Sequence, residues 1–364
     1  MAIDAPAPQG QYSIEQAAKP ALETRHNQTT FDPIELLKEY PGRKMSPDSP
    51  PLHHLRIVLP NSEPQQSVRP EPTRAPESDR SREISGATGA PDTPARIYEF
   101  KHLANRASDH GGADAIVRLP ENFDPTKPIH LLVYNHGLRS SVRSSFSETK
   151  MNEQLKDAPP NTVLIMPEWQ ANPASESSNQ GRFAEPGRFR AMLQEVFDKT
   201  PALAGKSLKD VADISITAHS AGNVPAQSEI YKNGLADKIK SITLFDALYN
   251  GGAFDRWIKD NINDLARGSK QFQNFYTTDG GTAGNSLSEL VRVRAMLRQA
   301  GLPGDKLAHD DNGSRTMEVN ELAQKSIVFK RTDLAVKGRG THMNVPNLYI
   351  NRVERAARLR EQDN

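Results

Sequence analysis

The segment from Ile214 to Asn223 constrains the fold more than any other part of the chain. An apolar, β-branched run ends at Ser220, and small residues lie two positions before and two positions after that serine. The residues from Asn223 to Gly234 then predict a helix. A strand that turns directly into a helix holds its turn residue in a tight conformation and aims its side chain out of the sheet. We therefore expect Ser220 at the carboxyl end of a buried strand.

The residues around this serine are similar to the G-x-S-x-G pattern of a nucleophile elbow. The segment is Ala218-His219-Ser220-Ala221-Gly222, so alanine replaces the first glycine and adds one methyl group. Alanine is still small enough for the helix to cross the strand closely. Taken alone, the segment is equally consistent with a serine that merely ends a buried strand, and the rest of the chain must supply the context.

The composition divides the chain near residue 94. Fifteen of the 27 prolines precede Ile97, among Ser, Gln, Glu and Arg. Such a stretch buries too little apolar surface to offset its ordering entropy, so we expect residues 1–94 to be disordered and 95–364 to form the folded domain. Within 1–94, residues 31–40 predict a short helix and residues 55–59 an edge strand. This region is also a candidate for binding a partner protein.

Charge and composition exclude several classes of function. The net charge is +1 with both signs interspersed, so we expect no nucleic-acid partner. No apolar run approaches the ~18 residues of a membrane span, so we expect no membrane insertion. The absence of a signal peptide indicates a cytoplasmic protein, with non-classical export as the alternative. The chain has no cysteine, which rules out disulfides, Cys-ligated zinc and thiol catalysis.

From residue 95 onward, apolar runs alternate with helical patterns. Two opening strands of antiparallel type come before this alternation. The pattern predicts an α/β fold with a mostly parallel sheet and helices on both faces. The expected strands cover residues 96–103, 114–119, 129–134, 162–166, 214–219, 241–245, 272–276 and 326–330, and the expected helices 145–155, 188–197, 223–234, 254–265, 287–302 and 348–359, with a capping box at Ser286–Glu289.

In such a sheet the functional site lies at the carboxyl ends of the strands. A serine hydroxyl is a poor nucleophile at neutral pH and needs a base within hydrogen-bond reach. His342 follows the last strand in a glycine-rich loop, Gly338-Arg339-Gly340-Thr341-His342, and is the expected base. His136 and His219 are less suited, because one belongs to an early turn and the other lies next to Ser220 and should point away from it.

A carboxylate must hold the histidine in its active tautomer. Asp246 and Asp279 each follow a strand and precede His342, so either gives the order Ser, Asp, His. Asp279 precedes Gly280-Gly281 and has an independent role as a turn residue. Asp246 has no such local explanation and is slightly favoured, with Asp279 as the alternative acid.

A negative charge that develops on a reacting carbonyl oxygen requires backbone amides around it. The amide of Ala221, at the start of the elbow helix, is one expected donor. The second should come from the turn Asn135-His136-Gly137-Leu138, through the amide of Gly137 or Leu138.

From about Arg96 to the C-terminus, the chain resembles the α/β-hydrolase superfamily. The resemblance rests on His136-Gly137, the elbow around Ser220, Asp246 or Asp279, and His342, in that strand context and order. It implies a serine hydrolase that works through an acyl-enzyme without a cofactor or metal.

The substrate is less constrained than the chemistry. The loop from Gln170 to Gly187 is polar, and no apolar lid is evident, which favours a small-molecule or polymeric polar acyl substrate in an open cleft. Trp169 is the expected substrate-binding aromatic residue, and Trp257 is a second candidate. A carboxylic ester is the expected substrate bond. An amidase or peptidase with the same triad, and a catalytically silent binding module, are the alternatives.

Overall fold

A computed structural model describes residues 82–83, 95–172, 177–335 and 340–362. The short helix expected over 31–40 and the edge strand expected over 55–59 lie outside these residues, as does almost all of the 1–94 region. Within that region, only Arg82 and Glu83 are described, and they form a short strand.

Within the described residues, ten strands form a single sheet with the order β1-β2-β3-β5-β4-β6-β7-β8-β10-β9. The opening strands β1, β2 and β3 pair antiparallel, and β3 is also antiparallel to β5. All later neighbours pair parallel, so the carboxyl ends of β4 to β10 lie along one edge. The strands are β1 (Arg82–Glu83), β2 (Arg96–Phe100), β3 (Ala115–Leu119), β4 (Ile129–Asn135), β5 (Thr162–Pro167), β6 (Val211–His219), β7 (Ile239–Phe245), β8 (Gln271–Tyr276), β9 (Leu307–Asp310) and β10 (Ile327–Arg331).

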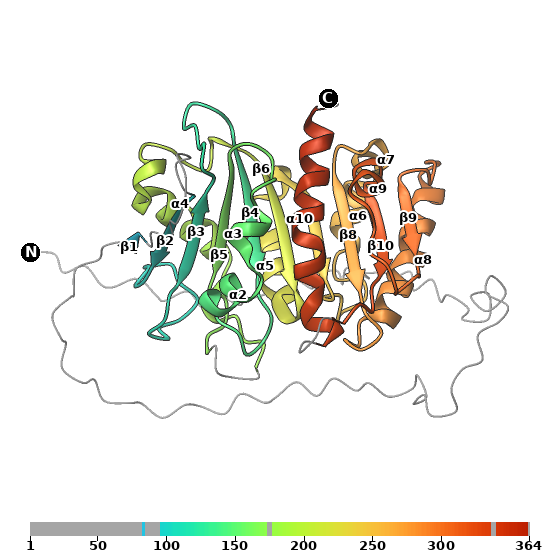
Figure 1. Cartoon of the computed structure of the whole chain (residues 1–364), viewed down its shortest axis with the longest axis horizontal. Coiled ribbons are helices and arrows are strands. Elements are labelled where there is room, and N and C mark those ends of the chain that lie inside the picture. Colours follow the sequence, from blue (N-terminus) through green and yellow to red (C-terminus); the bar gives the residue numbers. More distant parts are fainter. Residues whose placement is uncertain (1–81, 84–94, 173–176, 336–339, 363–364) are drawn as a thin grey trace, which may run out of the picture. The chain divides into compact units, whose positions relative to one another are not determined.

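Helices cover both faces of the sheet, which agrees with the expected α/β architecture. Each face of the sheet packs against its helices through a buried apolar cluster. One cluster lies beneath α4 to α8, and the other lies beneath α2, α3, α9 and α10. The long helix α10 lies across the front of the sheet (Figure 1). No helix among the described residues is both long enough and apolar enough to cross a membrane. The helices are α2 (Val142–Glu148), α3 (Met151–Gln154), α4 (Arg188–Lys199), α5 (Asn223–Lys232), α6 (Asp255–Asp260), α7 (Ile262–Arg267), α8 (Ala283–Gln299), α9 (Val319–Gln324) and α10 (Thr341–Gln362).

Two helices expected to be continuous are each divided in two. The helix predicted over 145–155 forms α2 and α3, because Lys150 between them has a φ of 50°, which a helix cannot include. The helix predicted over 254–265 forms α6 and α7, which join at Asn261. In both cases the apolar spacing continues across the break, so periodicity alone does not detect it.

The expected capping box is wrong, and β1, β9 and α9 are not among the predicted elements. Helix α8 begins at Ala283, one turn before the predicted start, and both members of the box are used elsewhere. Ser286 accepts a hydrogen bond from Asn274 at 2.8 Å, and Glu289 pairs with Arg292. Strand β9 and helix α9 were missed because both are short and only weakly apolar.

A buried carboxyl group joins the helix after the elbow to strand β4. Glu229 of α5 is 1% exposed and accepts a hydrogen bond from the side chain of Asn135, the last residue of β4, at 2.8 Å. Burial raises the pKa of Glu229 to about 8, and the Asn135 hydrogen bond opposes this only in part. A protonated carboxyl group therefore lies directly behind the elbow at neutral pH.

The two-residue strand β1 should contribute little to stability. It pairs with β2 only through Arg82 with Glu99 and Glu83 with Tyr98. We expect a chain that begins at Asp92 to fold, with a Tm within about 4 °C of the full chain by circular dichroism. A chain that begins at Asp114 also lacks β2 and should lose its cooperative transition. Failure of the Asp92 chain to fold would move the domain boundary towards the N-terminus.

The raised pKa of Glu229 predicts a pH-dependent stability. Between its ordinary value of 4.5 and about 8, the folded state keeps a proton at Glu229 that the unfolded state releases. The contribution is therefore fully present below pH 4.5 and is lost as pH rises towards 8, by up to about 1.4 kcal/mol per pH unit. Glu229→Gln should flatten this slope in urea unfolding, whereas Glu185→Gln on the surface should not. Equal slopes for Glu229→Gln and the unaltered protein would show that Glu229 ionises normally.

Candidate active site

Ser220 lies at a strained turn between β6 and α5. Its φ is 53°, a region that non-glycine residues rarely occupy outside sites where the surrounding structure enforces it. The strain is enforced by close packing, because a Cβ atom on Gly222 would lie 2.3 Å from the carbonyl oxygen of Asn135. Ala218 is fully buried on the strand side. The segment therefore has the geometry of the expected elbow, and alanine fits at its first position.

Asp246 is a fully buried carboxylate at the end of β7. It accepts hydrogen bonds from the hydroxyl of Thr277 at 2.6 Å, from the hydroxyl of Thr282, and from the ring Nδ1 of His342 at 2.7 Å. Burial would raise its pKa, but the hydrogen bonds from His342, Thr277 and Thr282 outweigh burial and lower the pKa below its ordinary range. The carboxylate is thus ionised, buried and fully engaged.

The second candidate acid, Asp279, lies apart from the imidazole. It is exposed, and its carboxylate accepts a hydrogen bond from Thr341 at 2.6 Å. Gly280, the residue after Asp279, is required for a reason other than turn formation. A Cβ atom on Gly280 would lie 1.8 Å from a carboxylate oxygen of Asp246, so only glycine permits this loop to close over that side chain. The structure places Asp246, rather than Asp279, against His342.

His342 lies in the first turn of α10, and its backbone is held by His219. Pro346 lies inside the same helix and has no N–H to donate to the carbonyl oxygen of His342 four residues earlier. The ring Nε2 of His219 lies 3.2 Å from that oxygen. Burial and the neighbouring His342 lower the pKa of His219 to about 3, so its ring is neutral and can donate this hydrogen bond. His219 therefore satisfies the carbonyl that Pro346 leaves open.

The turn from Asn135 to Leu138 lies against Ser220, as the sequence predicts for a second amide donor. A Cβ atom on Gly137 would lie 3.0 Å from the Cβ of Ser220. The turn is fixed from behind, because the two ring nitrogens of buried His136 face the carbonyl oxygen of Gly137 at 2.8 Å and the carboxylate of Glu168 at 2.9 Å. This arrangement holds the amides of the turn next to the serine.

The structure changes the interpretation of Trp169. This side chain is fully buried, and its indole N–H donates to the carbonyl oxygen of His136 at 2.8 Å. It supports the turn from below instead of lining a cleft. Trp257 is also buried, at 2% exposure. Both indole rings are packed into the core, so neither takes the position expected of a side chain that lines a cleft.

Two large exposed side chains neighbour candidate site residues, one by contact and one along the chain. Tyr249 and Met343 are the large hydrophobic side chains exposed among the described residues, at 39% and 45%. Tyr249 follows Asp246 closely in the chain and forms a hydrogen bond with Ser220, while burial raises its pKa. Met343 directly follows His342. Tyr249 therefore contacts Ser220, and Met343 is the chain neighbour of His342.

Several of these residues were not identified from the sequence. Glu168 follows β5 directly, so the rule that polar residues at carboxyl strand ends converge would have found it. Pro346 lies four residues after His342, so the sequence indicates that the carbonyl oxygen of His342 lacks its helical hydrogen bond. Thr277 directly follows β8, so the same rule for strand ends would have found it, whereas nothing in the sequence signals that Thr282 also converges on Asp246.

Comparisons with known proteins found similarity in structure only. No protein-family profile matches the sequence, and no curated protein sequence matches it. Among solved structures, the chain is similar to the feruloyl esterase module from Clostridium thermocellum, with 15% identity, 77% of this chain and 96% of that chain covered, and a TM-score of 0.47. It is also similar to an S-formylglutathione hydrolase from Agrobacterium tumefaciens, with 13% identity, 75% and 99% covered, and a TM-score of 0.41.

The topology identifies the fold. A parallel sheet whose second long strand is antiparallel, with a serine at a strained strand-to-helix turn and an aspartate and a histidine after later strands, is the arrangement of α/β-hydrolases. The described part of the chain therefore has the α/β-hydrolase fold.

Proposed function

We propose that the protein is a serine hydrolase that cleaves a carboxylic ester of a polar or polymeric substrate through an acyl-enzyme. The observation that carries this proposal is the 2.7 Å hydrogen bond between His342 and buried Asp246, at the same sheet edge as the strained Ser220. Such a chain of acid, base and hydroxyl activates serine for attack on a carbonyl carbon.

In the proposed reaction, the hydroxyl oxygen of Ser220 bonds to the carbonyl carbon, and its proton passes to Nε2 of His342. Asp246 accepts the hydrogen bond from Nδ1, which leaves Nε2 as the proton acceptor, and it stabilises the imidazolium that forms. The tetrahedral oxyanion receives hydrogen bonds from the amides of Ala221 and of Gly137 or Leu138.

Collapse of this intermediate breaks the ester bond, and the departing alkoxide takes the proton from His342. Water then attacks the carbonyl carbon of the acyl-enzyme and gives a proton to His342. Collapse of the second intermediate breaks the bond to the oxygen of Ser220, which takes this proton, and the acid is released. Each step conserves protons without a cofactor.

The surroundings of Ser220 support an acyl group with an apolar portion. Tyr249 is 39% exposed and forms a hydrogen bond with Ser220, and Met343 is 45% exposed and directly follows His342, so these two side chains are the candidates for contact with the group attached to the carbonyl carbon. The loop after β5 begins at the same edge, and its described residues 170–172 and 177–187 include many polar side chains, which suits a polar remainder of the substrate.

The proposed function is tested with a fluorophosphonate label and a panel of acyl esters and amides. Ser220→Ala should abolish labelling and lower turnover by up to ~10⁶-fold, because it removes the nucleophile. Ser147→Ala, on the exposed surface of α2, should change neither. Labelling that persists on Ser220→Ala would refute the assignment of the nucleophile. An unaltered protein that neither labels nor turns over any ester or amide would indicate a binding module.

The assignment of the acid is tested by two asparagine substitutions. Asp246→Asn should keep the fold but favour the wrong histidine tautomer, which lowers kcat by roughly 10⁴-fold. Asp279→Asn should have a mild effect, since its carboxylate binds only Thr341 among the described contacts. The measurement is kcat for the best ester of the panel. The opposite ranking would make Asp279 the acid and Asp246 a structural residue.

A further inference from the structure

The side chain of Tyr249 forms a hydrogen bond with Ser220. The sheet order places β6, the strand that precedes Ser220, between β4 and β7. The turn of residues 135–138, which includes the proposed oxyanion donors, follows β4, whereas Tyr249 belongs to the loop of residues 247–253, which follows β7. The turn and the hydroxyl of Tyr249 therefore approach the serine from strands on its two sides.

The loop that carries Tyr249 is held by side chains of neighbouring helices. The carbonyl oxygen of Tyr249 accepts a hydrogen bond from the side chain of Asn285 in α8 at 2.7 Å. The carboxyl group of Glu289, which is fully buried in the same helix, accepts a backbone N–H of the loop at 2.9 Å. The hydroxyl of Tyr231 in α5 donates to a backbone carbonyl oxygen of the loop at 3.1 Å. These contacts fix the loop, and with it Tyr249, beside the serine.

The hydrogen bond between Tyr249 and Ser220 has a defined direction when the serine reacts. The serine hydroxyl has one proton, which passes to His342 in the proposed reaction, so the serine oxygen accepts from the phenol. Burial and the nearby charge of Asp246 raise the pKa of Tyr249 and outweigh the opposing effect of its hydrogen bond with Ser220. The phenol therefore keeps its proton near neutral pH and is available as a donor to the serine oxygen.

A donor to this oxygen does not affect the two halves of the reaction equally. The free enzyme and the transition state of attack on the substrate both hold the hydrogen bond, so its contribution largely cancels in acylation. In the acyl-enzyme the serine oxygen is part of an ester and is a weak acceptor. When the second tetrahedral intermediate collapses, negative charge develops on this oxygen, and hydrogen bonds to charged acceptors are roughly twice as strong as neutral ones. The donor therefore accelerates deacylation selectively.

We propose that Tyr249 is a further catalytic residue, whose hydroxyl donates to the oxygen of Ser220 as the bond from this oxygen to the acyl carbon breaks. The phenol keeps its own proton throughout. His342 supplies the proton that the serine regains, so the step needs no further acid or base. This inference rests on the proposed serine-hydrolase function and adds a residue that acts mainly in its second half.

The test is Tyr249→Phe, which removes the hydroxyl and keeps the ring, with p-nitrophenyl acetate as the substrate. The ratio kcat/KM reports only the steps up to acylation. Intact-mass measurement after an acid quench gives the acetylated fraction at steady state, and the turnover rate divided by this fraction is the rate constant of deacylation. We expect Tyr249→Phe to lower this rate constant by roughly 10- to 100-fold, the effect of a lost hydrogen bond to a charged group, and to change kcat/KM by less than about threefold.

Tyr231→Phe is the matched control, because it removes a hydroxyl that supports the same loop through a backbone contact. It should not lower deacylation selectively. The inference is overturned if Tyr249→Phe leaves the rate constant of deacylation unchanged, if it lowers kcat/KM as strongly, as a loss of loop position would, or if Tyr231→Phe has the same selective effect. These outcomes leave the proposed function intact, whereas an unaltered protein that is not acetylated at Ser220 would overturn both.

Discussion

The carboxylate of Asp246 is the group on which the carboxyl edge of the sheet depends. It is fully buried and ionised, and an unpaired charge in such a position would be strongly unfavourable. Thr277, Thr282 and His342 therefore have to converge on it, which fixes the loop after β8, the start of α8 and the start of α10. The electrostatic demand of one side chain thus organises three segments that are distant in sequence.

A second constraint links the elbow to the histidine. His219 immediately precedes Ser220, so the strain that positions the serine also positions the His219 ring. That ring forms a hydrogen bond with the carbonyl oxygen of His342. This oxygen lacks its usual helical hydrogen bond, because Pro346 has no N–H to donate. The serine and the histidine are therefore held relative to each other through adjacent backbone, in addition to the Asp246 hydrogen bond. A proline in a helix usually weakens it, but here it leaves an acceptor that joins two parts of the site.

The sequence predicts the parts of this arrangement that follow from local pattern. Apolar runs place the main strands, and the rule that strand ends converge brings Ser220, Asp246 and His342 to one edge. Properties that depend on distant partners are not predicted. The Ser286–Glu289 pattern predicts a capping box, because the local sequence does not show that Asn274 and Arg292 bind these two side chains. The sequence around Trp169 is equally consistent with a ring that lines a cleft and with a ring buried beneath a loop, and the structure has the second.

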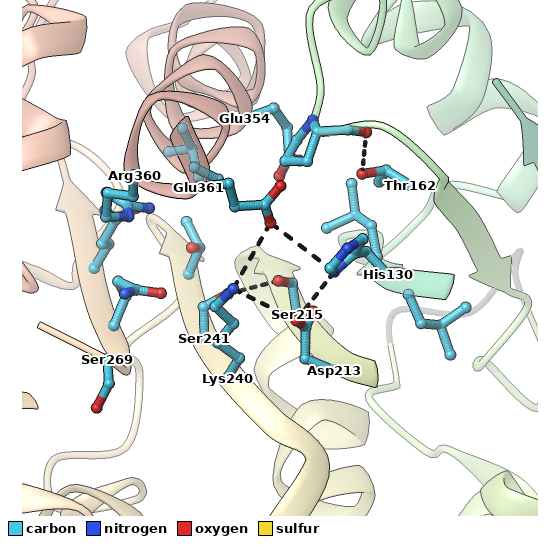
Figure 2. A pocket seen from close by; sticks show the side chains of 18 of the residues that line it. His130, Thr162, Asp213, Ser215, Lys240, Ser241, Ser269, Glu354, Arg360 and Glu361 are labelled. Atoms are coloured by element: carbon cyan, nitrogen blue, oxygen red, sulfur yellow. Dashed lines mark hydrogen bonds and ion pairs between the residues drawn. The ribbon is translucent and has the colours of Figure 1, made fainter. Parts of the chain in front are cut away.

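Helix α10 connects the two edges of the sheet, and its composition changes along its length accordingly. Its first turn carries His342, and its middle packs Tyr349, Ile350 and Val353 on the aromatic part of the sheet face. Its last turns carry Arg360 and Glu361, and Glu361 forms ion pairs with His130 of β4 and Lys240 of β7 (Figure 2). A helix of 22 residues spans about 33 Å, so His342 and Glu361 lie at opposite edges of the sheet. The helix is thus held by Asp246 at its first turn, by apolar contacts at its centre and by ion pairs at its end. The charged residues of its last turns, which the apolar spacing of the helix does not explain, are accounted for by these partners at the amino-terminal ends of the strands.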